Sequence, residues 1–197
     1  MKQAGAQQVM FLSLEGVENN SLTPHHKIEA LIREAGLSYT MLRPGFFMQN
    51  LSTTHLAEIR DRPKIFVPAG NGRTNLVDVA GIAAVAAQYL TEGKYLNAAL
   101  TLTGSEALTY SKIANTLTDV LSRKITHANP SVLRFVRQKA AREQTKIGFV
   151  LIAVTLYTVA KLGKAATLTD TVARVLGRPP ETFRQFAEDN KKVWMVR

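Results

Sequence analysis

Short apolar runs alternate with helical periodicity over the first two thirds of the chain. Residues 8–14, 37–42 and 99–103 are rich in apolar side chains with high strand propensity, which is typical of buried strands. The spacing of apolar residues predicts helices at 24–35, 78–90 and 109–121. Strands that alternate with helices predict an α/β fold with a parallel sheet and right-handed crossovers.

The first predicted helix has well-defined ends. Thr23 and Pro24 are residue types favoured at the N-terminal cap and first turn, and Gly36 is favoured just beyond the last turn. The apolar face is predicted to comprise Ile28, Leu31, Ile32 and Ala35. By the same periodicity His25 lies on the core side, whereas His26 shares a solvent-facing side with Glu29, Ala30 and Arg33.

The middle of the chain is less regular. Residues 46–60 are predicted to be helical, and residues 64–67 and 74–77 to form a hairpin around Gly70, Asn71 and Gly72. Residues 124–127 are a candidate short strand.

From residue 130 onward the pattern is helical only. It predicts a basic amphipathic helix at 131–146, an apolar helix at 147–160, and two more near 168–176 and 182–192. These helices are expected to form a C-terminal cap over one edge of the sheet. The apolar stretch of 14 residues is shorter than the ~20 needed to cross a bilayer, so it predicts a buried or an interfacial helix.

Composition excludes some classes of site. The 197 residues include no cysteine, which excludes a disulfide scaffold and any thiolate-bound metal. No two of the four histidines (His25, His26, His55 and His127) have the i, i+4 spacing of a metal pair, so no metal site is predicted. No apolar run follows the lysine near the N-terminus, so no secretory signal is predicted and the expected compartment is the cytoplasm.

The net charge of +10 lies in the last third of the chain. Residues 1–122 sum to zero, residues 123–146 carry +6 and residues 147–197 carry +4. A local anionic partner, such as a phosphate, a membrane surface or another subunit, therefore remains open. Only Phe135 accompanies the arginines of residues 123–146, so this segment is predicted to be a solvated helix face and to bind no nucleic acid.

Two predicted strand ends carry the candidate chemistry. Ligands of open α/β sheets bind at the carboxyl ends of the strands, here residues 12–16 and 42–50. Small residues at Ser13 and Gly45 would let a flat ligand approach the backbone, although Pro44 and Gly45 are equally explained as a strand terminator. His25 is likewise explained without catalysis, as a partly buried histidine at a helix N-terminus.

Several ordered blocks of this sequence resemble the NmrA-like family of atypical short-chain dehydrogenase/reductases. They are residues 9–13, His25 with Glu29, residues 35–51, 76–79, 102–106 and 177–180, and Phe183 with Phe186. The resemblance implies a Rossmann-type sheet and a pocket for NAD or NADP. It assigns residues 1–128 to a partial nucleotide-binding domain, with about three strands of the sheet, and residues 129–197 to the cap.

Two departures from the family pattern stand out. The glycine-rich phosphate loop that the family carries on its first strand is not found here, so the chain is expected to lack about half of that domain, as a fragment, a truncated reading frame or one piece of a split protein. In the usual Tyr-x-x-x-Lys pair, the tyrosine position holds Ser21 and the lysine position holds His25, while Ser13 keeps the serine position. Whether the chain is an enzyme is therefore left open.

The resemblance implies hydride transfer from NAD or NADP to a small acceptor such as a quinone. Ser13 and His25 would orient the acceptor, and the nicotinamide side would be lined by Ser13, Pro44, Gly45, Phe46, Phe47 and Asn50. Two alternatives remain: a regulatory module that senses the nucleotide without turnover, and a non-functional remnant. Without a neighbouring fourth strand, residues 8–14 are expected to form an exposed edge that pairs with another chain.

Overall fold

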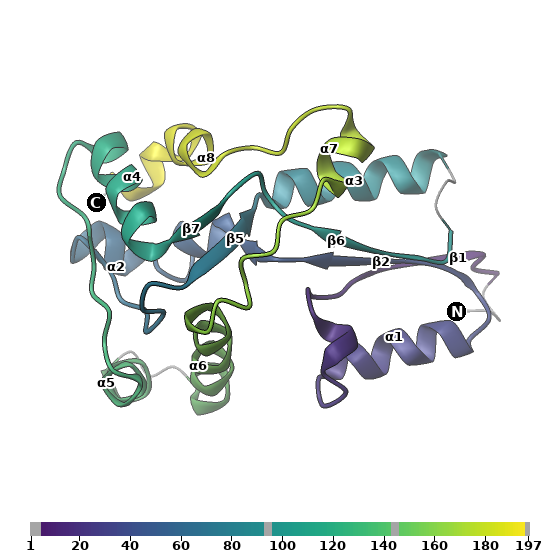
Figure 1. The fold of residues 1–197 in the computed structure, drawn as a ribbon, viewed down its shortest axis with the longest axis horizontal. Helices are drawn as coiled ribbons and strands as arrows, with labels where there is room; N and C mark the ends of the chain where they lie inside the picture. The colour runs from purple at the N-terminus through teal and green to yellow at the C-terminus, as the bar shows by residue number, and fades with distance from the viewer. Residues whose placement is uncertain (1–4, 93–95, 143–145, 196–197) are drawn as a thin grey trace. The chain divides into compact units, whose positions relative to one another are not determined.

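The computed structural model describes residues 5–92, 96–142 and 146–195 (Figure 1). Tertiary contacts divide the chain into two units. The first unit consists of residues 1–47, 77–105 and 169–181, and the second of residues 48–76, 106–168 and 182–197. Each unit therefore draws on both sides of residue 128, and the division at that residue into nucleotide-binding and cap regions remains a prediction.

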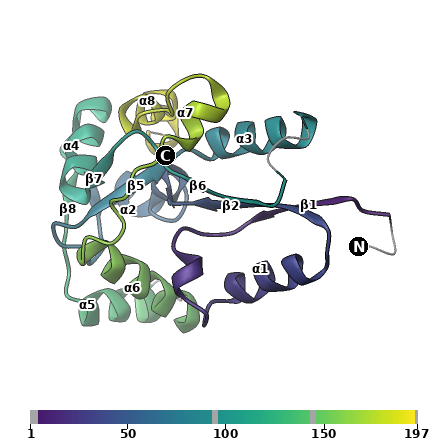
Figure 2. The same cartoon turned by 45° about the vertical axis from the view of Figure 1, so that its right-hand side comes forward.

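Three parallel strands form the sheet of the first unit. β1 (Gln8–Leu12) pairs with β2 (Ser38–Pro44), and β2 pairs on its other side with β6 (Ala98–Leu102). α1 (Pro24–Glu34) covers one face of this sheet, and α3 (Val79–Glu92) and α7 (Thr171–Leu176) cover the other (Figure 2). The short 3-10 helix η2 (Val17–Asn19) precedes α1. The predicted α/β fold with a parallel sheet is confirmed.

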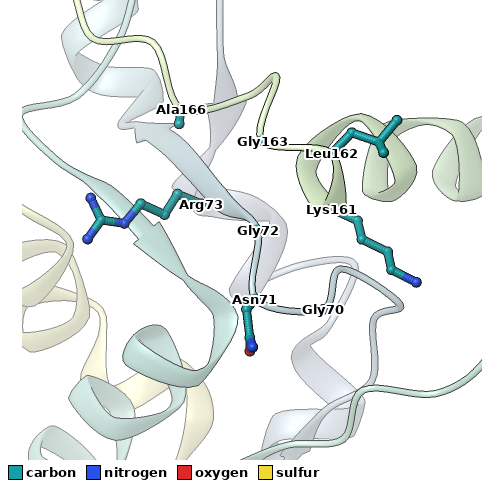
Figure 3. Close-up of a pocket in the computed structure, with 8 residues that line it drawn as sticks. All are labelled: Gly70, Asn71, Gly72, Arg73, Lys161, Leu162, Gly163 and Ala166. Carbon is teal, nitrogen blue, oxygen red and sulfur yellow. The ribbon is translucent and has the colours of Figure 1, made fainter.

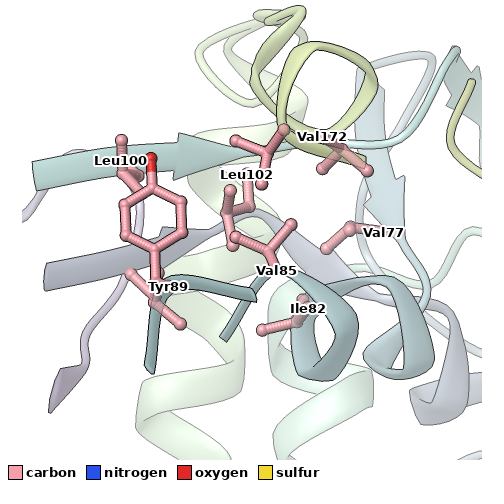
Figure 4. Close-up of a cluster of buried hydrophobic side chains, with 9 residues drawn as sticks. Val77, Ile82, Val85, Tyr89, Leu100, Leu102 and Val172 are labelled. Carbon is pink, nitrogen blue, oxygen red and sulfur yellow. The ribbon is translucent and has the colours of Figure 1, made fainter. Parts of the chain in front are cut away.

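Aliphatic side chains and one tyrosine make the core between the sheet and α3. Leu100 and Leu102 of β6 pack with Val85 and Tyr89 of α3 (Figure 4). Leu42 of β2 belongs to the same cluster. Val77, Ile82, Val172 and Val175 complete this cluster. Burial of such side chains stabilises the fold by about 1.5–3 kcal/mol each, so this cluster fixes α3 on the sheet.

The predicted ends of α1 are confirmed, but the predicted face is not. The Thr23 hydroxyl accepts a hydrogen bond from the His26 amide at 3.3 Å, and Gly36 has the positive φ of 62° expected after a helix. Of the predicted apolar face only Ile32 is buried, and Glu29 is buried beside it. Apolar residues do not mark the buried face of α1, because the Glu29 carboxylate, paired with Arg43, occupies part of that face.

Short strands and helices make up the second unit. β4 (Lys64–Ile65) pairs in parallel with β8 (Thr126–His127), and β5 (Arg73–Val77) pairs antiparallel with β7 (Ala107–Thr109). The predicted hairpin of residues 64–67 and 74–77 is therefore wrong, because each of its strands has a distant partner. The prediction of a helix over residues 46–60 is also wrong, since β3 (Phe46–Phe47), the 3-10 helix η3 (Met48–Leu51) and α2 (Leu56–Asp61) divide that segment.

The remaining helices follow the sequence closely. They are α4 (Tyr110–Leu121), α5 (Val132–Arg137), a π-helical turn η4 (Gln138–Arg142), α6 (Ile147–Lys161), α8 (Phe183–Asp189) and a 3-10 turn η5 (Lys191–Trp194). The basic helix predicted at 131–146 is thus a short α-helix followed by a π turn, and residues 143–145 lie outside the described residues. No helix in the described part of the chain has the length and apolar character needed to span a membrane.

Candidate functional site

Backbone hydrogen bonds bring Ser13, Pro44 and Gly45 to the carboxyl edge of the first unit's sheet. The Ser13 amide donates to the Leu42 carbonyl at 2.7 Å, which extends the pairing of β1 with β2 by one residue. The Gly45 amide donates to the Leu102 carbonyl at 3.0 Å, so the turn after Pro44 is tied to β6. These three residues therefore occupy the place where open α/β sheets bind ligands.

The other predicted site residues are distributed between the two units. Phe46 and Phe47 form β3 and are half-buried, as part of the first unit. His25 lies in the first turn of α1, half-buried, with its ring centroid 5.9 Å from that of Phe11 in β1. Asn50, in η3, belongs to the second unit. The first unit thus contains each predicted site residue except Asn50.

His26 is placed differently from the sequence prediction. Its Nδ1 is 3.0 Å from the Val17 carbonyl oxygen, and the ring is half-buried. His26 therefore links α1 to η2, so the solvent-facing side predicted for it is wrong.

A buried ion pair lies next to Ser13 and was missed by the sequence analysis. Arg43 donates two hydrogen bonds to Glu29, from Nε to Oε1 at 3.0 Å and from Nη2 to Oε2 at 2.6 Å. Arg33 donates to the same Oε2 at 2.7 Å, and Glu18 binds the Nη1 of Arg43 at 2.9 Å. The sequence signal for this pair was Arg43, a charged residue near the end of the mainly apolar strand 38–44. A buried guanidinium requires an acidic partner, so this arginine indicates an ion pair.

Electrostatics keep Glu29 ionised. Burial alone would raise its pKa, but Arg43, the nearby Ser13 hydroxyl and Arg33 together outweigh burial and lower the pKa from 4.5 to about 2. The Arg43 guanidinium has its pKa raised in turn, mainly through its hydrogen bond to Glu29. This pair fastens α1 to the end of β2 and holds the surroundings of Ser13 in place.

The Ser13 hydroxyl is buried at this edge. It contributes to lowering the Glu29 pKa, yet among the described residues it has no hydrogen-bond partner of ordinary length. A buried hydroxyl without a partner costs about 1–3 kcal/mol, so a ligand oxygen or nitrogen bound beside it would be stabilised.

A second buried polar cluster lies within the second unit. His55 is 3.1 Å from Glu58 through Nδ1 and 2.7 Å from the Tyr157 hydroxyl through Nε2. Lys139 binds the other Glu58 oxygen at 3.0 Å, and all four side chains are buried. The pKa of Glu58 is lowered, because its contacts with His55 and Lys139 outweigh burial, and burial raises the pKa of Tyr157.

This cluster joins helices that are far apart in the sequence. His55 and Glu58 come from the region of α2, Lys139 from η4 and Tyr157 from α6. The sequence signal for this cluster was the i, i+3 spacing of His55 and Glu58, which places the two side chains on one side of a helix. Among the residues that the structure describes, no three His, Cys, Asp or Glu side chains are grouped as a metal site.

Two shallow hollows indent the second unit. The first, of about 560 Å³, lies between residues 70–73 and the end of α6 (Figure 3). Arg73 and Lys161 at its rim point away from one another, so they do not converge on an anion (Figure 3). The second, of about 510 Å³, is lined by His127 and residues of α4, and burial lowers the pKa of that histidine.

Comparison with known proteins identifies the family. Residues 1–157 match the model of the NmrA-like family. The chain belongs to the NmrA-like family. An NAD(P)H azoreductase of Xenophilus azovorans is 33% identical over 161 residues, which are 80% of this chain and 54% of that protein. An agroclavine dehydrogenase of Claviceps fusiformis is 33% identical over 169 residues, covering 82% of this chain and 57% of that relative.

Solved structures of other proteins share the fold. An NADPH-dependent quinone oxidoreductase of Escherichia coli superposes with a TM-score of 0.85 at 22% identity, over 95% of this chain and 69% of that one. NmrA, a negative transcriptional regulator, superposes at 0.69 and 15% identity, over 95% and 65%. The Rossmann-type fold is thereby confirmed. This NmrA-like chain spans little more than half the length of the curated relatives named above.

Proposed function

We propose that this chain supplies the nicotinamide and acceptor side of an NAD(P)H-dependent reductase that transfers hydride to a small acceptor such as a quinone. The observation that carries the proposal is the buried Ser13 hydroxyl, which has no partner of ordinary length among the described residues and lies at the carboxyl edge of the parallel sheet. The azoreductase, the clavine dehydrogenase and the quinone oxidoreductase named above support reduction of an unsaturated acceptor.

The residues at this edge fit a nicotinamide ring. The glycine at position 45 has no side chain, and the half-buried aromatic rings of Phe46 and Phe47 offer apolar surfaces for a flat ligand. Pro44, Gly45, Phe46 and Phe47 would line the ring. The bound NAD(P)H would supply the hydride, and the preference between NAD and NADP is left open.

Ser13 and His25 would act on the acceptor. The Ser13 hydroxyl would donate a hydrogen bond to the acceptor oxygen, and the half-exposed His25 imidazole would deliver a proton drawn from water. Reduction of a quinone to the hydroquinone consumes one hydride and one proton, so a water-accessible imidazole suits delivery of that proton. Glu29 and Arg43 would act only by holding the edge.

The proposal extends to the wider organisation of the chain. Residues 1–128 would serve the nucleotide and residues 129–197 would cap the sheet, with the cytoplasm as the compartment. A second chain, paired through β1, is the proposed partner.

Turnover with reduced nicotinamide mononucleotide tests the proposal, because this half of the cofactor has no pyrophosphate and needs no pyrophosphate site. The purified 197-residue chain is mixed with reduced nicotinamide mononucleotide and a water-soluble benzoquinone, and loss of absorbance at about 340 nm is followed. We expect oxidation above the protein-free rate, reduced at least roughly tenfold in Ser13→Ala and in His25→Ala. Ser38→Ala serves as a control on the same sheet. A rate equal to that of the protein-free mixture would reject turnover.

The alternative is a module that senses the nucleotide without turnover. The observation that favours it is the residue pair at the usual catalytic positions, where exposed Ser21 stands in place of tyrosine and His25 in place of lysine. Binding of the mononucleotide without oxidation in the same assay would support this alternative over the reductase.

A further inference from the structure

The outer face of α6 exposes a wide apolar surface in the second unit. Large apolar side chains on this face and at its end are exposed by 36% or more: Ile147, Phe149, Leu151, Ile152, Leu156, Val159 and Leu162. At about 100° per residue these positions cover an arc of about 200°. Contiguous exposed apolar surface of this kind marks an interaction site.

The two polar side chains on this face, Thr155 and Thr158, form hydrogen bonds within α6 itself. The Thr155 hydroxyl donates to the Leu151 carbonyl at 3.0 Å, and the Thr158 hydroxyl donates to the Val154 carbonyl at 2.7 Å. Their hydrogen bonds therefore need no water, so the whole arc is compatible with an apolar medium.

The opposite face of α6 is fixed, so the exposed face cannot rotate inward. Tyr157 bonds to His55 at 2.7 Å and contacts Phe135 of α5 at 5.8 Å between ring centroids. Val150 and Ala160 are buried on the same side. α5 and α6 lie side by side in both views (Figures 1 and 2).

Basic residues flank this apolar surface along the sequence. Between Asp119 and Asp170 the sequence holds nine lysines and arginines and a single acidic residue, Glu143. Exposed lysines stand at both ends of α6, Lys146 before it and Lys161 and Lys164 at and after its end. α5 adds Leu133, which is 79% exposed, next to exposed Arg134.

We propose that α6, with α5 beside it, docks this protein onto an anionic lipid surface. The apolar arc would enter the boundary between headgroups and acyl chains, and the lysines would reach the lipid phosphates along their aliphatic stems. A second copy is disfavoured as the occupant, since it would bring two strongly basic surfaces together.

Vesicle sedimentation of the full chain tests the docking. We expect the protein to pellet with vesicles of phosphatidylcholine and phosphatidylglycerol, and at least roughly tenfold less with phosphatidylcholine alone. Phe149→Gln combined with Ile152→Gln should lower binding to the anionic vesicles by roughly tenfold or more. Leu31→Gln, an exposed leucine of α1, is the matched control and should bind as wild type.

Charge is tested by a second pair of variants that does not touch the apolar face. Lys164→Glu should weaken binding several-fold, whereas Lys27→Glu, which makes the same change in net charge on exposed α1, should not. Far-UV circular dichroism confirms that each variant folds.

Because the chain contains no cysteine, a single label reports the surroundings of the face directly. An environment-sensitive fluorophore on Leu151→Cys should shift to the blue with anionic vesicles, and one on Leu31→Cys should not. No binding, equal binding to both kinds of vesicle, or binding unchanged by the Phe149 and Ile152 substitutions would overturn the proposal. A dimer seen by light scattering and abolished by those substitutions would overturn it in favour of a second copy.

Discussion

Arg43, near the end of β2, donates two hydrogen bonds to the Glu29 carboxylate of α1, at 3.0 and 2.6 Å. The Glu29 side chain is only 2% exposed, so this pair is a buried contact between helix and sheet. It stands next to Ser13, whose hydroxyl contributes to the same electrostatic balance. The geometry of the candidate site therefore depends on an ion pair that takes no part in the proposed chemistry.

Removing the carboxylate should destabilise the fold strongly. Glu29→Leu would leave Arg43 buried with only the half-exposed Glu18 as partner, and we expect a loss of about 3 kcal/mol in the free energy of unfolding. Glu34→Leu, at an exposed position of the same helix, should change stability by no more than about 0.5 kcal/mol. Urea unfolding followed by circular dichroism measures both, and equal effects would contradict a buried role for the pair.

The Glu29 carboxylate should make the free energy of unfolding depend on pH in the acid range. Its pKa is about 2 in the folded protein against an ordinary value of 4.5, so its contribution is complete above pH 4.5 and is lost as pH falls through about 2. The shift corresponds to roughly 3 kcal/mol. Urea midpoints of wild type and Glu29→Gln, compared from pH 7 to about 2, should converge at the acid end. A gap that stays constant over that range would show that Glu29 is not the group responsible.

Gly72 should be intolerant of any side chain. A Cβ at this position would collide with the Ala160 carbonyl oxygen and lie 2.8 Å from the Lys161 Cα, both of them backbone atoms of α6. We expect Gly72→Ala to cost about 2 kcal/mol or more. Gly81→Ala in α3 meets nothing within 4 Å and should gain up to about 1 kcal/mol from helix propensity. Thermal melts of the two variants should shift in opposite directions.

β1 should behave as an unprotected edge. Among the described residues it pairs with β2 on one side, and Leu12 at its end is 49% exposed. Such an edge tends to pair with another chain. Light scattering should show association, and hydrogen exchange should find unprotected amides within residues 9–13 at dilution. A monomer with slow exchange at every one of these amides would contradict the prediction.

Local signals in the sequence predict the elements well, and the partners of short strands poorly. Capping at Thr23 and the apolar runs of β1, β2 and β6 each have a cause within a few residues, so those elements are confirmed. Residues 64–65 pair instead with residues 126–127, and no local pattern encodes a partner that distant. β7, three residues long, is too short to leave a pattern and was missed.

For the candidate site, too, the sequence predicts what has a local cause and misses contacts between distant residues. The strand ends that carry Ser13 and Gly45 follow from apolar runs and a Pro-Gly turn, and the structure places both at one edge of the sheet. The Glu29–Arg43 pair and the cluster around His55 were missed, because each joins residues from different elements through side chains alone. Buried charge inverts the helical pattern, so Glu29 was assigned to the solvent side.

The central claim is that the edge formed by Ser13 and Gly45 holds a nicotinamide. Amide chemical-shift mapping of the isotope-labelled chain during titration with nicotinamide mononucleotide tests it most directly. We predict shifts at Ser13, Gly45 and Phe46, with saturation only at millimolar concentration. NADPH should bind little better, since the sequence contains no Gly-x-x-Gly-x-x-Gly loop to hold its pyrophosphate. Micromolar binding of NADPH, or shifts confined to the hollow at residues 70–73, would contradict this account.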